Sequence, residues 1–183
     1  IARGNVMPAA QFAEDDGMRL PESIFLQTVT RHYPGATSAA MSPAEIDIVL
    51  RPDPRTVRRV PWAAEPTAQV IHDCFYSDGR RVQMAPREVL RHVVDLYAQK
   101  GWEPIVAPEL EFYLIEPNID ADYQLKPPVG RSGRAEPGRQ SYSIAAVNEF
   151  DPLFDDLYQL GGGGGIEIDT LIHEDGPAQM EIN

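Results

Sequence analysis

The spacing of apolar residues changes near residue 84, and this change divides the chain into two parts. Before it, short apolar runs are separated by Pro and Gly with little helical periodicity, and 45–50 and 68–75 are predicted as strands. A turn is predicted at 77–79. The connection between the two strands is expected to be loop or sheet edge, because prolines interrupt it at Pro52, Pro54, Pro61 and Pro66.

After residue 84 the pattern predicts two helices and three strands. The first helix begins near Pro86 and ends near Gly101, with apolar residues at helical spacing: Val89, Leu90, Val93, Val94 and Tyr97. The second helix begins at Asp151-Pro152 and carries an apolar side of Leu153, Phe154, Leu157 and Tyr158. Strands are predicted at 104–115, 166–172 and 178–182, and a long surface loop at 122–139. The expected fold class is α+β.

Five consecutive glycines, Gly161 to Gly165, stand where the second helix should end. One glycine would cap a helix, but five lose ordering entropy and offer no side chain to pack. A phosphate-binding loop is not expected, because the Lys-Ser/Thr pair of such loops does not follow. We expect a flexible segment and assign it no function.

Composition narrows the class of protein. The 183 residues are 43% hydrophobic, which allows one domain or two small ones, and no apolar run of about 18 residues predicts a membrane span. A formal net charge of −12 without a dense Lys/Arg cluster argues against a nucleic-acid surface. The single cysteine, Cys74, suits a reducing, cytoplasmic compartment. The start at Ile1 and the stop on a strand-like run at Asn183 indicate a piece of a longer protein.

Two acidic pairs carry the candidate chemistry. In the strand containing Glu109 and Glu111, alternation places both carboxylates on one face, with α-carbons about 7 Å apart. Glutamate is a weak strand former, and a bound cation would offset the repulsion between the two charges. In the second segment, Glu181 alternates with apolar residues, and the predicted turn returns Glu174 to its side.

If these two segments are neighbours, four carboxylates converge. An anionic site made only of oxygen ligands suits Mg²⁺ or Mn²⁺, and structural zinc is not expected without a Cys cluster. Alternatives stay open at this point. Glutamates at alternate strand positions can line a solvated face, His173 can be a hydrogen-bonded core or edge histidine, and Asp169 can be structural.

At these residues the chain resembles the glutamine synthetase family. Residues 108–114, Pro-Glu-Leu-Glu-Phe-Tyr-Leu, are similar to the family's strand Pro-Glu-x-Glu-Phe-x-Leu, and 173–181 are similar to its second metal-binding segment. Residues 46–53, followed by Pro61-Trp62, resemble the end of its small N-terminal domain. The resemblance implies a β-grasp domain at 1–82, with its first strand possibly missing, and the start of a catalytic α/β domain at 83–183.

The resemblance also implies roles. Glu111, Glu174 and Glu181 would hold one metal ion and Glu109 a second, while Asp169 falls near a position that contacts nucleotide. The family's reaction transfers phosphoryl from ATP to the γ-carboxylate of glutamate, and an amine then attacks the acyl phosphate. Catalytic residues are not assigned. The chain stops before residues that complete the family's site, so this piece is expected to be inactive by itself. The intact parent is expected to form a homo-oligomeric ring.

The expected amine follows from a departure from the family pattern. Members that use ammonia carry Asp-Gly-Ser-Ser in the N-terminal domain, whereas the corresponding stretch, 17–24, has no Asp-Gly and contains Glu22 and Ser23 as the acceptor-site region. Residues 127–134 and 141–143 resemble the γ-glutamylpolyamine synthetase branch. A polyamine or other primary amine is therefore the expected acceptor. The alternatives are an ammonia-using glutamine synthetase, a non-catalytic scaffold of the same fold, and a stand-alone metal-binding module.

Overall fold

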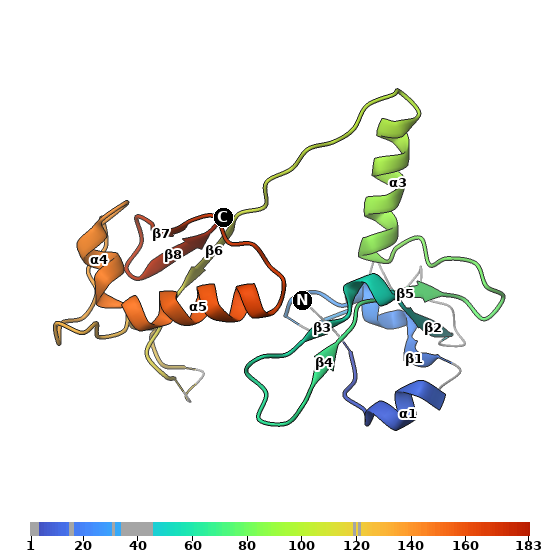
Figure 1. Cartoon of the computed structure of the whole chain (residues 1–183), viewed down its shortest axis with the longest axis horizontal. Helices are drawn as coiled ribbons and strands as arrows, with labels where there is room; N and C mark the ends of the chain where they lie inside the picture. Colours follow the sequence, from blue (N-terminus) through green and yellow to red (C-terminus); the bar gives the residue numbers. More distant parts are fainter. Residues whose placement is uncertain (1–3, 15–16, 31, 34–45, 119, 121) are drawn as a thin grey trace. The chain divides into compact units, whose positions relative to one another are not determined.

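The computed structural model describes the chain except residues 1–3, 15–16, 31, 34–45, 119 and 121. Contacts divide it into two compact units (Figure 1). Unit 1 comprises residues 1–57 and 69–104, and unit 2 comprises residues 58–68 and 105–183. The domain boundary expected near residue 82 stays a prediction, because these units describe contacts and not family domains.

An antiparallel three-stranded sheet forms the centre of unit 1. Its strands β1 (Met18–Pro21), β2 (Asp47–Pro52) and β5 (His72–Phe75) lie in the order β1-β2-β5, with Leu50 opposite both Met18 and Cys74. Alternate residues of β2 face the core, where Ile48 and Leu50 pack with Val82 and Ala85. Among the described residues, short helical segments accompany the sheet: α1 (Ala9–Glu14), η1 (Glu22–Leu26) and η2 (Pro54–Thr56).

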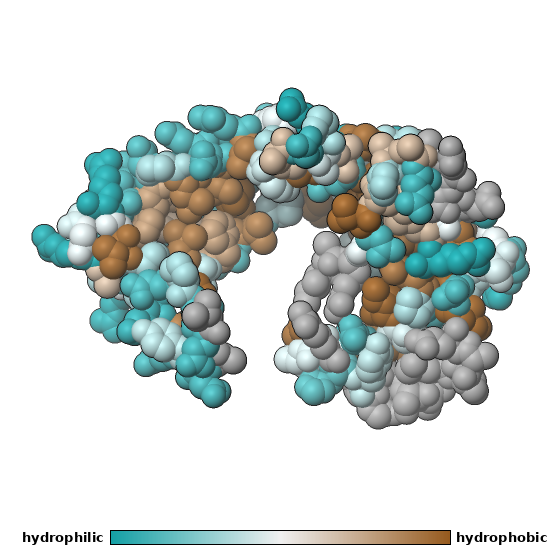
Figure 2. All heavy atoms as spheres, turned by 90° about the horizontal axis from the view of Figure 1, so that it is seen from below, coloured by the Kyte–Doolittle hydropathy of each residue, from teal (hydrophilic) through white to brown (hydrophobic). Residues whose placement is uncertain are grey.

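Helix α3 (Pro86–Ala98) begins as the sequence predicts, with Pro86 in its first turn. Gly101 adopts a φ of 71° just beyond its end, which a residue without Cβ accepts readily. All residues of α3 are described and none is buried, so its apolar stripe is exposed. Figure 2 shows hydrophobic residues, in brown, on one face of the molecular surface. Among the helices that the structure describes, none has the length and apolar character needed to cross a membrane.

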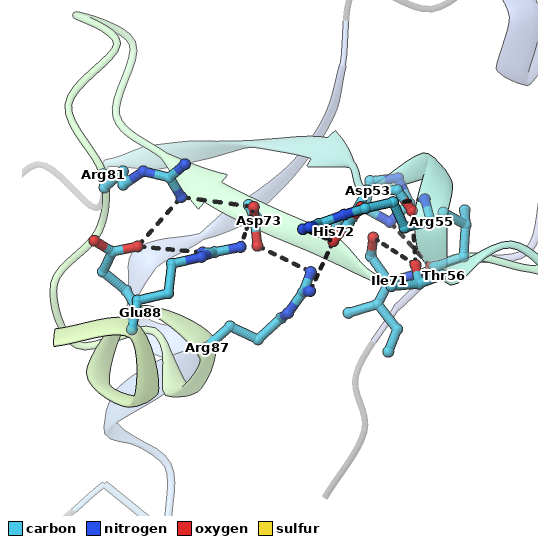
Figure 3. A network of polar contacts seen from close by, with 11 residues as sticks. Asp53, Arg55, Thr56, Ile71, His72, Asp73, Arg81, Arg87 and Glu88 are labelled. Atoms are coloured by element: carbon cyan, nitrogen blue, oxygen red, sulfur yellow. Dashed lines mark hydrogen bonds and ion pairs between the residues drawn. The ribbon is translucent and has the colours of Figure 1, made fainter. Parts of the chain in front are cut away.

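A network of ion pairs ties α3 to the sheet of unit 1. Arg87 lies between two aspartates, with Nη2 2.8 Å from Asp53 Oδ2 and Nη1 3.0 Å from Asp73 Oδ1 (Figure 3). Arg91 Nη2 lies 2.6 Å from Asp73 Oδ2. Asp53 is only 6% exposed, and hydrogen bonds from Arg55 and then Arg87 hold its pKa well below the usual range.

Unit 2 is built on a second antiparallel sheet. Strands β6 (Leu110–Tyr113), β7 (Leu171–His173) and β8 (Gln179–Ile182) lie in the order β6-β8-β7. Helices α4 (Ile144–Glu149) and α5 (Asp151–Gly163) precede β7, and Phe154 of α5 packs with Ala178 and Met180 against one face of the sheet. A short ribbon of β3 (Arg58–Arg59) and β4 (Ala68–Gln69) is separate from this sheet.

The glycine run forms the last turn of a helix and its cap in this structure, and the flexible segment expected from the sequence stays a prediction. Helix α5 continues to Gly163, and the chain then leaves it in a Schellman motif. Ile166 N donates to Gly161 O at 2.9 Å, Gly165 N donates to Gly162 O at 3.1 Å, and Gly165 has a φ of 71°. A Cβ on Gly161 would lie 2.8 Å from Ile168 Cδ1, so this position has a packing reason to be glycine.

Several sequence predictions were wrong in extent. The strand predicted at 104–115 shortens to β6, the one predicted at 166–172 starts later and ends one residue later as β7, and the one predicted at 68–75 divides into β4 and β5. The strand predicted at 45–50 begins at Asp47, and Glu45 lies outside the described residues. Helices α1 and α4 and strand β1 were not predicted. The loop at 122–139 contains a buried acid, Glu136, and is therefore not only a surface loop. The β-grasp fold is not confirmed.

Candidate metal site on the sheet of unit 2

The register of β6, β8 and β7 gathers acidic residues on one sheet face. Glu111 lies directly opposite Glu181, and residues opposite each other in an antiparallel pair share a face. Gln179 lies on the same face two residues before Glu181, and Glu174 N donates to Gln179 O at 2.8 Å across the hairpin. The pairing of the two predicted acidic segments, which the sequence left conditional, is thereby confirmed.

Glu174 carries the clearest sign that these carboxylates interact. Its pKa is raised, first by burial, then by a hydrogen bond with Glu181, and further by the negative charges of Glu181 and Glu111. Glu181 is only 8% exposed. A buried carboxylate beside two others costs free energy unless a proton or a cation compensates. Burial and the neighbouring negative charges therefore both disfavour the ionised form of Glu174.

Gln179 orients Glu111 through both ends of its amide. Its Nε2 donates to Glu111 Oε2 at 2.7 Å, while its Oε1 accepts from the Tyr113 hydroxyl at 3.0 Å and from Gly176 N at 2.9 Å. Because both amide atoms have partners, the direction of the amide is determined. The sequence showed Gln179 only as part of a motif and gave no sign of this role.

The opposite side of the hairpin holds a buried histidine. His173 is fully buried, and its Nε2 lies 2.9 Å from Glu136 Oε1 while its Nδ1 lies 2.6 Å from Glu174 O. Gln140 Nε2 donates to the same Glu136 oxygen at 2.5 Å. The interpretation of His173 as a hydrogen-bonded core residue is consistent with these contacts. The sequence analysis missed Glu136. It lies in a stretch rich in Pro, Gly and Arg, and nothing in that stretch indicates that its side chain is buried.

The carboxylates of Glu111, Glu174 and Glu181 do not form a complete coordination sphere in this structure. Among the residues that the structure describes, no group of three or more His, Cys, Asp or Glu side chains is close enough to hold an ion. Glu109 is exposed and precedes β6, and the register continued by one residue places it beside Asn183. The donor set is nevertheless all oxygen and strongly anionic, which fits Mg²⁺ or Mn²⁺, and Glu111, Glu174 and Glu181 are the residues that would hold it.

The other predicted site residues lie elsewhere. Asp169 is exposed two residues before β7, and its N donates to Asn183 O at 2.8 Å. Glu22 and Ser23 belong to η1 in unit 1. Ser23 is buried, and Glu22 Oε1 accepts a hydrogen bond of 2.6 Å from the Tyr76 hydroxyl, which raises the pKa of Tyr76.

Curated relatives named as amine ligases match the sequence. The chain is 31% identical over 140 residues to a γ-glutamylethanolamide synthetase of Streptomyces coelicolor, covering 74% of this chain and 29% of the relative. It is 29% identical to a γ-glutamylputrescine synthetase of Escherichia coli K12, over 99% of this chain and 39% of that protein. It is 30% identical to a glutamate–isopropylamine ligase of a Pseudomonas species, over 100% of this chain and 40% of that protein. The chain thus spans 29–40% of the length of these relatives.

Solved structures show the same fold. One described as apo GmaS without ligand superposes with a TM-score of 0.67 at 24% identity, over 99% of this chain and 38% of that one. A novel glutamine synthase homolog gives a TM-score of 0.66 at 22% identity, over 98% and 39%. The names of the curated relatives agree with the resemblance to the γ-glutamylpolyamine synthetase branch. The model of the glutamine synthetase catalytic domain matches residues 83–183, and the chain therefore belongs to the glutamine synthetase family.

Proposed function

We propose that this chain is the N-terminal part of an ATP-dependent ligase that joins the γ-carboxyl of glutamate to an amine through a γ-glutamyl phosphate. The observation that carries the proposal is the shared sheet face of Glu111, Glu174 and Glu181 in a member of this family. An isolated acidic pair is compatible with a solvated strand. Three interacting carboxylates, one of them buried, are better explained by a cation that the reaction requires.

Each glutamate has a proposed part in binding. Glu111, Glu174 and Glu181 hold one divalent ion and Glu109 contributes to a second, while Asp169 contacts nucleotide. Bound Mg²⁺ or Mn²⁺ would neutralise phosphate charge and align the reacting oxygen atoms. Gln179 keeps Glu111 turned along the sheet face, because its amide is held by Tyr113 and Gly176 at the other end. Of the proposed ligands, Glu111 is therefore oriented by the protein before an ion arrives.

A primary amine or polyamine is the proposed acceptor, and Glu22 and Ser23 belong to its region. The matches to the isopropylamine ligase and the putrescine synthetase extend over 100% and 99% of this chain, whereas the match to a glutamine synthetase of Mycobacterium bovis, 31% identical, covers 76% of this chain and 30% of that protein. The match to the γ-glutamylethanolamide synthetase covers 74% of this chain, so coverage alone does not separate the two groups. The acceptor proposal rests on residues 17–24, which lack Asp-Gly, and on the resemblance of residues 127–134 and 141–143 to the polyamine branch.

Ammonia is the second candidate acceptor, and one observation favours it. Asp16 directly precedes the stretch 17–24 and forms an Asp-Gly pair with Gly17, so an acid is available there, although Asp16 lies outside the described residues. A variant Asp16→Asn separates the two readings. It should reduce turnover with ammonia if Asp16 serves that substrate, and it should leave turnover with amines unchanged if the acceptor region is formed by Glu22 and Ser23.

The wider architecture remains part of the proposal. We place a β-grasp domain at residues 1–82 and the first part of the catalytic domain at 83–183, in a protein that assembles as a homo-oligomeric ring in the cytoplasm. Its partners are glutamate, ATP and the amine.

Glutamate-dependent release of ADP by the native protein that contains this chain tests the reaction. Ammonia, putrescine, longer polyamines and simple monoamines are compared as acceptors at saturating Mg²⁺. Preference for an amine supports the proposal, and preference for ammonia replaces the acceptor. Absence of turnover with every acceptor, together with absence of metal binding, would identify a scaffold instead.

A further inference from the structure

A buried pair of side chains supports the hairpin behind the acidic face. His173 is fully buried and Glu136 is 5% exposed, and they come from segments 37 residues apart in the chain. A buried carboxylate and imidazole cost free energy to desolvate, and their retention calls for a compensating role. The sheet and the proposed reaction do not account for this pair.

The hydrogen bonds of His173 connect the buried pair to Glu174. A carbonyl oxygen only accepts, so His173 Nδ1 must donate to Glu174 O over their 2.6 Å separation. The other ring nitrogen faces Glu136 Oε1 at 2.9 Å, and that contact determines the rotation of the ring. Glu136 therefore acts through His173 on the backbone of Glu174, whose side chain lies on the acidic face.

The segment that contains Glu136 is itself attached to the hairpin. Arg139 N donates to Asp175 O at 2.6 Å, Tyr142 N donates to His173 O at 2.8 Å, and Ser141 Oγ donates to Asp175 Oδ1 at 3.2 Å. These bonds hold residues 139–142 against both sides of Glu174. The hairpin turn is thus held by a second layer of chain and not only by its own strands.

Backbone conformation marks the same place. Within the described part of the chain, the non-glycine residues with positive φ are Arg139 at 65°, Tyr142 at 61° and Ala178 at 53°. Two lie in the attached segment and the third is in the hairpin turn. Left-handed conformations of such residues cost free energy and persist where the surrounding contacts determine the backbone, often beside a functional site.

We propose that Glu136 is a positioning residue for the metal-binding carboxylate of Glu174. The inference rests on the proposed function, because it requires that Glu174 bind a divalent ion. Residues behind metal ligands orient them, and their loss typically weakens metal affinity about 10- to 100-fold. A purely structural pair would instead lower stability and leave the affinity of the folded protein unchanged.

This role is tested by titrating the full chain with Mn²⁺ and measuring the bound ion by electron paramagnetic resonance. We expect Glu136→Ala to bind Mn²⁺ about 10- to 100-fold more weakly than the wild type. Glu136→Gln keeps a hydrogen-bonding group of the same size beside Nε2 and should recover most of the affinity. Phe154→Ala serves as a matched control, since it disturbs the core of the same unit without touching the pair, and its folded form should bind like the wild type.

Two further measurements keep the outcomes distinct. In the absence of metal, the NMR signal of the hydrogen-bonded Nδ1 proton of His173 should disappear in Glu136→Ala. The signal should be retained in Glu136→Gln. If Glu136→Ala does not fold, Gln140→Leu leaves Glu136 in place and removes the Nε2 group that donates to Glu136 and to Pro137 O, and about fivefold weaker binding is expected. Wild-type affinity in these folded variants would overturn the positioning role alone. Absence of Mn²⁺ binding by the wild type would overturn the proposed metal site, and the positioning role with it.

Discussion

Replacing Met180 by Ala should destabilise the sheet that carries the candidate site. Met180 is fully buried and packs with Phe154 and Ala178, while its neighbour Glu181 lies on the acidic face. Removal of Cγ, Sδ and Cε loses transfer free energy of about 2.4 kcal/mol at about 0.8 kcal/mol for each group. The cavity left behind adds to this loss, so the expected total is about 2–5 kcal/mol.

Native-state hydrogen exchange at the amides of β8 measures this change within unit 2. A loss of 2 kcal/mol corresponds to about 30-fold faster exchange, and each further loss of about 1.4 kcal/mol makes exchange about tenfold faster again. Leu125→Ala is the control, because Leu125 is 62% exposed and its truncation should change stability by less than about 0.5 kcal/mol. Equal protection in wild type and Met180→Ala would show that the core has been misassigned.

The remaining predictions concern the ion-pair network and the glycine run. The depressed pKa of Asp53 means that the folded state binds fewer protons than the unfolded chain, so this stabilisation is present above the ordinary pKa of about 3.9 and is lost as the pH falls below it. Arg87→Ala should therefore lower the urea midpoint at pH 7, and the midpoint of this variant should fall less than that of the wild type between pH 7 and pH 3. Arg80→Ala breaks a pair with an exposed aspartate and should change the midpoint little. Equal effects of the two substitutions would contradict the network. Gly162→Ala should stabilise α5 by about 0.5–1 kcal/mol, because a Cβ there meets no atom within 4 Å. Gly165→Ala should cost about 1–2 kcal/mol because of its positive φ, and thermal unfolding that ranks the two variants in the opposite order would refute the capping assignment.

Sequence alternation predicted the acidic face because a strand has a strict period of two. Once Glu111 and Glu181 are assigned to strands, their partition from Phe112 and Met180 follows from pleat geometry. That β6 pairs with β8 is a tertiary fact, and the sequence could give it only as a condition. The partner also decides where a strand ends, which explains why β6 and β7 are shorter than their apolar runs.

The features that the sequence missed depend on contacts between distant residues. Glu136 looks like one more charge in a loop, and its burial appears only when His173 is brought beside it. Strand β1 ends at Pro21 and has four residues, so its pairing with β2 identifies it better than its composition does. Helix α4 has six residues, too few for a periodic pattern, although Ser143 provides its cap by accepting from Ala146 N.

The central claim is that Glu111, Glu174 and Glu181 together hold a divalent ion. Its most direct test is Mn²⁺ titration of the wild type, Glu174→Gln and Glu167→Gln. Glu167 is an exposed residue of the same unit, so its substitution makes the same change in net charge away from the sheet face. The account predicts binding by the wild type and Glu167→Gln and its loss in Glu174→Gln. Equal affinity in all three proteins, or no binding by the wild type, would contradict it.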